Sequence, residues 1–401
     1  MVVTNANVVL PEGVKRVDVR IEEGRIAEIG ENLRGERFDA KGRYLLPAMI
    51  DIGVGVRDGR LRGGTLERLA DKAGRNGFGT VALTALCTPR VDNEITLEFV
   101  KSQAERSDAA RIETLVAGVK GEGGLADCAI LVKEGGVGIE FESALDGNRI
   151  RRLMEYARLL EVPLFCRAND PALQGDGVMQ EGEVAARLGL AGVPELAESS
   201  QVARVGEFAK EYGVDVVVLH ASTPRTLEIC RDNPRLTAQV PLPHLLLDES
   251  ACDDYDTSGK IWPPLRSAES RDAMAQMVRK GEVPMLTSLH SPVSETAKDA
   301  VFAEAAYGID GMEGFLPLLY RRFVAEERLG WSDVVRLTSE NAAKILGLSD
   351  RRGRIAVGHD ADLILFDPQA AANEPDARSP YRSCGRQGSV EKLATIAAAQ
   401  R

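Results

Sequence analysis

The sequence predicts an α/β protein, because short apolar runs rich in β-branched residues alternate with amphipathic stretches through most of its 401 residues. Eight such runs occupy residues 45–56, 80–86, 113–118, 136–142, 162–168, 215–222, 236–242 and 283–290. Strands that are apolar on both faces and alternate with helices form parallel sheets. Eight strand–helix units favour closure into a (β/α)8 TIM barrel, and an open doubly wound sheet is the alternative.

Helix-start signals follow several of these runs. Thr65 is placed to cap a helix after the first run, and Thr223 precedes Pro224, a residue type favoured at the first helical position. Asp146 precedes an amphipathic stretch after the fourth run. These signals support a helix after each of these strands, as a parallel sheet requires.

The two ends of the chain show a different pattern. Apolar residues alternate on both sides of a turn at residues 22–24, which is typical of a β-hairpin. Residues 354–367 place a Gly-His-Asp turn before another alternating run. We therefore predict a small β-sandwich formed by residues 1–47 and 351–401, around a barrel over residues 48–350. An open sheet leaves the matching patterns at the two ends unexplained.

The composition excludes several classes of protein. Hydrophobic residues make up 44% and charged residues 28%, as in ordinary globular proteins. The net charge of −11 disfavours nucleic acid and anionic membranes as partners. There is no apolar run of about 18 residues, no basic leader and no CxxC pair among the six cysteines. We therefore predict a cytoplasmic protein with reduced thiols and with no nucleic-acid or membrane partner.

Several motifs, in order along the chain, resemble the dihydroorotase branch of the amidohydrolase superfamily. The matching segments are residues 51–57, 175–182, 188–194, 220–223, 244–247, 263–266, 307–319, 338–344 and 353–363. Each segment is weakly specific alone, but together they span nearly the whole chain. The resemblance implies a barrel with a β-sandwich. It also implies the hydrolysis of a ring amide by metal-activated water, at the C-terminal ends of the strands.

The same resemblance implies a dismantled metal site, and the chain has only four histidines in all. The two first-strand ligand histidines fall on Gly53 and Gly55, and the strand-five ligand falls on Arg167. The strand-eight aspartate, which is both ligand and general base, falls on Leu289, so that only the strand-six ligand remains, as His220. Because a catalytic zinc needs about three protein ligands, we predict no zinc, no other cofactor and no catalytic residue.

Positions that contact substrate in the family are altered as well. The bridging acidic position falls on Phe141 or Glu142, and the strand-eight loop histidine falls on Val293. Two asparagines of the family fall on Cys87 and Trp262. The arginine that binds the substrate carboxylate in the family is retained, as Arg57. We predict a vestigial pocket formed by Arg57, His220, Arg167, Cys87, Trp262 and Glu142.

Within this pocket the structural interpretations are preferred to the functional ones. We interpret His220 as a strand-end histidine hydrogen-bonded in a polar pocket. We expect Arg57 and Arg167 to form ion pairs with Asp51, Glu142 or Asp170. This is preferred to the alternative, in which the two arginines form a binding site for an anion. A substitute metal site could use His220, His290, Cys166, Cys87 and Glu142. Strand alternation should however turn Cys166 and His290 away from the barrel lumen.

The function implied by the resemblance is that of a catalytically inactive dihydroorotase homologue. Such a protein binds aspartate carbamoyltransferase and helps to assemble it in de novo pyrimidine biosynthesis, as a homo- or hetero-oligomer. One alternative is an active metal-dependent cyclic amidohydrolase, dihydroorotase- or hydantoinase-like, with an atypical site. The other alternative is a metal-free ligand-binding scaffold.

Overall fold

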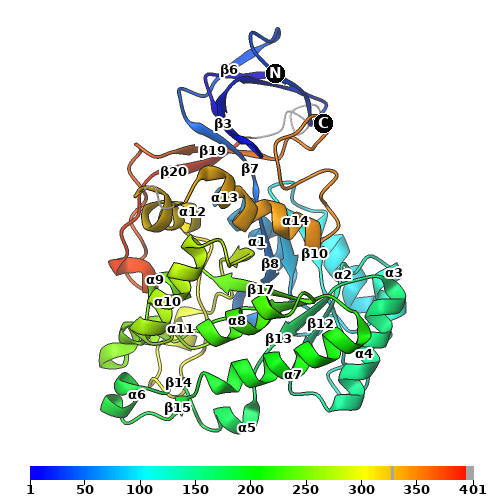
Figure 1. The fold of residues 1–401 in the computed structure, drawn as a ribbon, viewed down its shortest axis with the longest axis vertical. Coiled ribbons are helices and arrows are strands. Elements are labelled where there is room, and N and C mark those ends of the chain that lie inside the picture. The colour runs from blue at the N-terminus through cyan, green and yellow to red at the C-terminus, as the bar shows by residue number, and fades with distance from the viewer. Residues whose placement is uncertain (327–328, 394–401) are drawn as a thin grey trace.

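The computed structural model describes residues 1–326 and 329–393 and shows a mixed α/β fold. A small all-β part that contains the N-terminus lies at one end of the long axis, and the α/β body makes up the rest (Figure 1). Residues 394–401 of the predicted second sandwich segment lie outside the described residues. No helix in the described part is both long and apolar enough to cross a membrane.

The body contains two parallel sheets, and each of the eight apolar runs contributes to them. One sheet has the order β10-β9-β8, and the other has the order β11-β12-β13-β16-β17-β18. The bounds are β8 (Met49–Val54), β9 (Phe78–Leu83), β10 (Arg111–Thr114), β11 (Val116–Ala117), β12 (Ile139–Glu142), β13 (Leu164–Arg167), β16 (Val216–Leu219), β17 (Leu236–Pro241) and β18 (Met285–Thr287). The predicted strands are therefore confirmed, and they follow one another in chain order.

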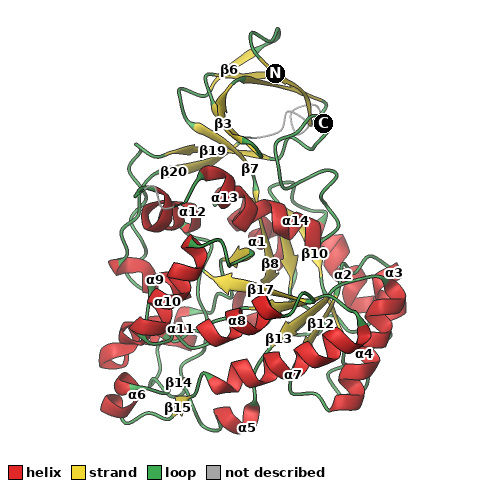
Figure 2. Cartoon of the chain, in the orientation of Figure 1, coloured by secondary structure: helices red, strands yellow, loops and turns green. Residues whose placement is uncertain are grey.

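Helices alternate with these strands and cover the outside of the sheets (Figure 2). They include α1 (Thr65–Arg75), α2 (Glu94–Ala104), α3 (Cys128–Lys133), α4 (Gly147–Leu160), α7 (Leu196–Tyr212), α8 (Pro224–Asp232), α10 (Ala268–Arg279), α12 (Phe315–Leu319), α13 (Trp331–Val335) and α14 (Asn341–Ile345). Shorter elements between them are α5 (Pro171–Gln174), β14 (Met179–Gln180), α6 (Glu183–Leu188), β15 (Gly192–Val193), α9 (Pro243–Leu246) and α11 (Glu295–Lys298).

Two of the three predicted helix starts are confirmed. The side chain of Thr223 accepts a hydrogen bond from the backbone N–H of Thr226, and that of Asp146 caps α4 in the same way. Thr65 is instead the first residue of α1, and Gly64 occupies the cap position. Gly64 has a φ of 72°, a conformation that glycine adopts without steric cost.

The remaining strands at the two ends of the chain form two small sheets, with the orders β5-β4-β1-β6 and β20-β19-β7-β2-β3. The second of these sheets contains strands from both ends of the chain. Their bounds are β1 (Val2–Thr4), β2 (Asn7–Leu10), β3 (Gly13–Arg16), β4 (Asp18–Glu22), β5 (Arg25–Gly30), β6 (Arg37–Asp39), β7 (Tyr44–Pro47), β19 (Leu363–Asp367) and β20 (Ser389–Lys392). The predicted hairpin is the antiparallel pair β4–β5. Because β19 pairs with β7, residues more than 300 positions apart are held together.

Candidate active site

A cavity of about 500 Å³ opens where the parallel strands of the body end. Five of the six residues predicted for the pocket line it, namely Glu142, Arg167, Cys87, Trp262 and His220. The cavity is also lined by the four positions at which the family has metal ligands and this chain has none. These positions are Gly53, Gly55, Arg167 and Leu289. The structure therefore brings together residues that the sequence spreads over more than 200 positions.

Arg57 is the exception. Its side chain is exposed and is not among the residues that line the cavity, so the prediction that it belongs to the pocket is wrong. The chain turns immediately after β8, through a short 3-10 segment at Arg57–Gly59. The N–H of Asp58 donates to the carbonyl of Pro292 at 2.9 Å, which fixes this turn against the segment after β18.

Arg167 forms an ion pair at the base of the cavity. Its Nε donates to Oε1 of Glu140 at 2.6 Å, and its Nη2 donates to Oγ1 of Thr84 at 3.1 Å. The Glu140 side chain is fully buried and also accepts a hydrogen bond from the N–H of Ala85 at 2.6 Å. The guanidinium is therefore held in one orientation by several bonds, and its charge is balanced inside the protein.

The prediction that Arg167 pairs with Asp51, Glu142 or Asp170 is wrong, because each of these carboxylates has other partners. Asp51 is buried and accepts hydrogen bonds from Thr287 and Ser288, and burial raises its pKa. Glu142, at the mouth end of its strand, pairs with Arg90 at 3.2 Å. Asp170 caps α5.

Glu140 is the site residue that sequence reasoning missed. It lies two positions before Glu142 on the same strand, so the two side chains share a face of the sheet, and Glu140 is the deeper one. A carboxylate in the middle of an apolar run is a signal in the sequence that could have identified Glu140. Burying it is costly unless a cation or hydrogen-bond donors meet it, so its presence predicts a buried partner.

His220 has one nitrogen bonded and the other free. Its Nδ1 lies 3.3 Å from Nη1 of Arg167, and a guanidinium can only donate, so Nδ1 accepts. Burial, and then the charge of Arg167, lower the pKa of His220 well below its usual value, so the ring is neutral and its hydrogen is on Nε2. Nε2 is buried and has no hydrogen-bond partner among the described residues. The predicted hydrogen bonding of His220 is therefore confirmed for Nδ1 alone.

Gly53 lies beside the free nitrogen of His220. A Cβ atom placed on Gly53 would be in van der Waals contact with Nε2 and with the Leu219 side chain, at 3.4 Å from each. Gly53 also has a φ of 79°, in the left-handed region that favours glycine.

His290 is among the residues that line the cavity, but its imidazole lies beside Asp310, which is not among them. Leu289, immediately before it, has a left-handed φ of 57°. Nδ1 of His290 lies 3.3 Å from Oδ1 of Asp310, and Asp310 also pairs with Lys72 at 2.7 Å. Burial raises the pKa of Asp310, but His290 and Lys72 outweigh it and lower this pKa to about 2. Cys166 is buried and does not line the cavity, as expected.

The wall of the cavity is largely apolar. The rings of Trp262 and Tyr307 meet edge to face with centroids 5.2 Å apart. Leu86 and Ile309 line the same cavity, and burial raises the pKa of the Cys87 thiol to about 12, so Cys87 is neutral. Val293 is not among the residues that line it.

The side chains at the family's ligand positions do not fit a zinc ion. Gly53, Gly55 and Leu289 have no donor atom, and Arg167 is a cation. Within residues 1–326 and 329–393, no group of three or more His, Cys, Asp or Glu side chains is arranged to hold a metal ion. The substitute site from His220, His290, Cys166, Cys87 and Glu142 is therefore not formed by these residues.

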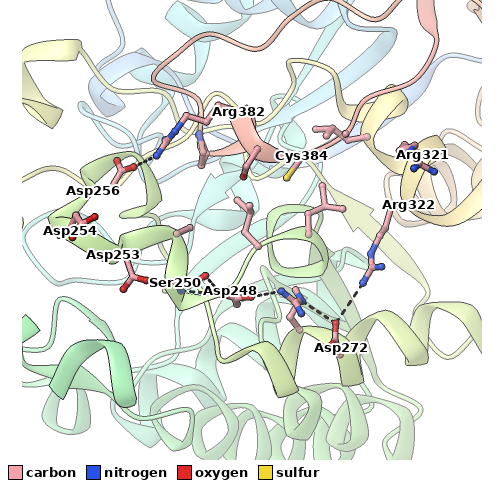
Figure 3. A pocket seen from close by; sticks show the side chains of 18 of the residues that line it. Asp248, Ser250, Asp253, Asp254, Asp256, Asp272, Arg321, Arg322, Arg382 and Cys384 are labelled. Carbon is pink, nitrogen blue, oxygen red and sulfur yellow. Dashed lines mark hydrogen bonds and ion pairs between the residues drawn. The ribbon is translucent and has the colours of Figure 1, made fainter. Parts of the chain in front are cut away.

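A second, larger cavity of about 1230 Å³ lies between α10 and residues 380–385, and none of the predicted site residues lines it (Figure 3). Its charged side chains largely neutralise one another. Arg271 pairs with Asp248 and with Asp272, and Arg382 pairs with Asp256. We assign no chemistry to this cavity, because most of its charges are already paired.

Comparisons with known proteins identify the family. A dihydro-orotase-like family model matches residues 42–225, and an amidohydrolase family model matches residues 266–391. A dihydroorotase from Syntrophotalea carbinolica is 33% identical over 384 residues, which cover 92% of this chain and 89% of that protein. The chain belongs to the dihydroorotase-like amidohydrolases. A dihydroorotase from Mycobacterium tuberculosis is 32% identical over 371 residues, with 89% and 86% of the two chains covered.

Solved structures that are less similar in sequence show the same fold. An L-hydantoinase from Arthrobacter aurescens superposes with a TM-score of 0.86 at 21% identity, with 98% of this chain and 95% of that chain covered. A D-hydantoinase from Thermus sp. gives a TM-score of 0.82 at 22% identity, with 98% and 92% covered.

Membership of this family corrects two predictions. The predicted inactive assembly protein is wrong, because relatives that match over nearly the whole chain are dihydroorotases and the fold is that of hydantoinases. The same comparison contradicts the predicted absence of any cofactor, because the resemblance to dihydroorotases implies metal-activated water. Groups other than the side chains at the family's ligand positions would have to hold such a metal, because those side chains do not fit a zinc ion. Association with aspartate carbamoyltransferase and the oligomeric state stay predictions.

Proposed function

We propose that this protein hydrolyses cyclic amides in the cavity that Arg167, His220 and His290 line. The observation that carries the proposal is the meeting, in one cavity, of a fixed guanidinium, a neutral imidazole with a free N–H and a second histidine beside a carboxylate. Membership of the dihydroorotase-like family supplies the class of reaction.

In this proposal the two parallel sheets form one (β/α)8 barrel over residues 48–350, flanked by a sandwich of residues 1–47 and 351–401. Two observations support it. Only Leu115 separates β10 from β11, and the N–H of Gly55 donates to the carbonyl of His290 at 2.7 Å, which links the segments after β8 and β18. The cavity then lies at the C-terminal face of the barrel, where such barrels have their active sites.

The first requirement of ring-amide hydrolysis is a donor for the carbonyl oxygen. Negative charge develops on that oxygen when a nucleophile attacks, and donors fixed in advance stabilise it. Among the described residues, Nε2–H of His220 has no partner, and four of the five N–H groups of Arg167 are used, which leaves one on Nη1. The carbonyl oxygen of a ring amide would accept from these two donors.

The second requirement is a base that takes a proton from water and returns it to the ring nitrogen. His290 lines the cavity, and the carboxylate of Asp310 beside Nδ1 favours a hydrogen on that atom. Nε2 is then the basic atom. In the reaction a C–O bond to water forms and the ring C–N bond breaks. The proton accepted by Nε2 passes to the leaving nitrogen.

The test is ring opening by the purified full-length protein, followed by NMR with dihydroorotate, 5,6-dihydrouracil and hydantoin. We expect opening of at least one ring, and a rate for His290→Asn lower by at least about 100-fold. His359→Asn is the matched control. His359 is a buried histidine outside the cavity, hydrogen-bonded to the carbonyl of Ser349, and its change should leave the rate unaltered. The proposal fails if no ring is opened, or if His290→Asn is as active as the parent.

A further inference from the structure

We propose that Lys298 is a modification site, at which the side-chain amine takes up carbon dioxide and becomes a carbamate. Lys298 is the last residue of α11, and its carbonyl accepts a hydrogen bond from Oγ1 of Thr257 at 2.8 Å. Neither Lys298 nor the neighbouring Lys260 is among the residues that line the cavity at the strand ends. The modification site is therefore separate from the proposed site of ring opening.

Two backbone carbonyls hold the Lys298 side chain. Its Nζ donates to the carbonyl of Lys260 at 2.6 Å and to that of Thr257 at 2.9 Å. A neutral amine has two N–H groups and one lone pair. Because each N–H group meets an acceptor, the lone pair of the amine points away from the two carbonyls, where an electrophile can reach it.

The neutral form of Lys298 is populated near neutral pH. Burial lowers the pKa of Lys298 from the ordinary 10.5 to about 8, and the charge of Lys260 acts in the same direction. About a tenth of the Lys298 side chains are therefore neutral at pH 7.

The other titratable groups near Lys298 are Cys252 and Asp256, and both raise its pKa. Burial raises the pKa of the Cys252 thiol to about 12, so this thiol is neutral. The carboxylate of Asp256 pairs with Arg382 (Figure 3). Within residues 1–326 and 329–393, no carboxylate forms an ion pair with Lys298.

Lys260 is a buried cation that also has no carboxylate partner in the described part of the chain. It is 2% exposed, and its Nζ donates to the carbonyls of Phe302 at 2.6 Å and Ala303 at 2.9 Å. The same atom lies 4.8 Å from the ring centroid of Tyr307. Only dipoles and ring faces balance this charge, so an anion placed beside it would be stabilised.

The adduct that suits this place is small and negatively charged. Lys298 is only partly exposed, which disfavours a long acyl chain, and Lys260 favours an anion. Carbon dioxide meets both conditions. The lone pair of Nζ forms a bond to the carbon atom, one C–O π pair moves onto oxygen, and one proton passes from Nζ to water. The product keeps one N–H group and carries one negative charge.

The carbonyls that Lys298 now contacts would keep hydrogen-bond donors after the reaction. The carbonyl of Thr257 also accepts from the N–H of Lys260 at 3.1 Å. The carbonyl of Lys260 also accepts from the N–H of Gly308 at 3.3 Å. Carbamate formation therefore leaves neither acceptor without a partner, which would be costly in a buried place.

The test exposes the full-length protein to carbon-13 bicarbonate near pH 8, where dissolved carbon dioxide is the reactant. Carbamates are trapped as alkyl esters with an oxonium reagent, and labelled peptides are quantified by mass spectrometry. Lys280, an exposed lysine that follows α10, is the internal control. We expect at least about tenfold more label on Lys298 than on Lys280, and no label at this position in Lys298→Arg. No label on Lys298, or equal label on the two lysines, would overturn the proposal.

A second variant tests the contribution of the neighbouring cation. Lys260→Met should lower the label on Lys298 by at least about tenfold, because the carbamate loses its counter-charge and the amine holds its proton more tightly. Unchanged label would overturn this role of Lys260. If thermal denaturation shows that Lys260→Met does not fold, the comparison of Lys298 with Lys280 in the parent decides. The label is measured without turnover, so its outcome is separate from that of the ring-opening test.

Discussion

Arg167 donates from Nε to Oε1 of Glu140 at 2.6 Å, and the carboxylate of this pair is completely shielded from water. Breaking the pair leaves a charge in the protein interior without a counter-charge. We expect Arg167→Met and Glu140→Gln each to lower the free energy of unfolding by about 3 kcal/mol. The double variant Arg167→Met/Glu140→Met should cost clearly less than the sum of the single changes, as measured by chemical denaturation.

The exposed pair of Arg90 and Glu142 provides the control for this experiment. Their side chains are 33% and 55% exposed, so Arg90→Ala should change stability by less than about 1 kcal/mol. Strict additivity in the Arg167 and Glu140 variants would show that the two side chains do not depend on each other.

Gly53 has a left-handed backbone, whereas Gly55 does not. We expect Gly53→Ala to lower the free energy of unfolding by about 1–2 kcal/mol, because a Cβ atom is disfavoured at this φ. In Gly55→Ala the new Cβ would lie 3.1 Å from Oγ of Ser291, which can rotate away, and 3.3 Å from the Cα atom of Ser291, which has to shift by a few tenths of an ångström, so we expect a smaller loss. Thermal or chemical denaturation of the two variants provides the comparison. Equal losses would contradict the explanation.

Asp310 should give a pH-dependent contribution to stability. The pKa of its carboxyl falls from the ordinary 3.8 to about 2, so its contribution is present above pH 3.8 and is lost as the pH falls through 2. The side chain is 41% exposed, and screening by solvent reduces the contribution to about 1 kcal/mol. Asp310→Asn should therefore be less stable than the parent at pH 7 and equal to it near pH 2. A difference that persists at pH 2 would assign the effect to packing.

Restoring the family's ligand side chains should increase zinc binding. The variant carries Gly53→His, Gly55→His, Arg167→His and Leu289→Asp, and it adds these donors to His220. A cation would then balance Glu140, which loses the guanidinium. We expect more zinc per chain than in the parent, measured by mass spectrometry on the purified protein. The same variant with His220→Ala should bind less, and equal zinc in all three proteins would contradict the geometry.

We expect the restored variant to gain little dihydroorotate hydrolysis. Cys87 and Trp262 would still stand where the family resemblance places asparagines, and residues that act as a unit do not recover one at a time. Ring opening measured beside the metal content separates the two effects.

Local signals in the sequence were enough for most of the fold. The eight apolar runs became the strands of the two parallel sheets, and the cap at Thr223 and the hairpin at β4–β5 formed as predicted. These features depend on side-chain periodicity and on turn residues within a few positions of one another. The start of α1 differed by one residue, because a left-handed glycine can replace a side-chain cap.

The candidate site was predictable only in part. Sequence reasoning placed Arg167, His220 and Trp262 in one pocket, as observed. It gave Arg167 the wrong partner, however, and it included Arg57 in the pocket. The partner depends on the register of β12 against β13, which places Glu140 below Arg167. Register is a property of the sheet and not of either strand alone.

The sequence by itself therefore determined which chemical groups are present at the strand ends. It also determined which groups of the family are missing from this chain. Tertiary structure decided how those groups act on one another. It set the imidazole of His290 beside Asp310, and it placed Arg57 outside the cavity lining through the turn after β8. Among the described residues it also left Nε2 of His220 without an acceptor. The reason is physical, because charge balance and unsatisfied hydrogen bonds arise between segments that only the folded chain brings together.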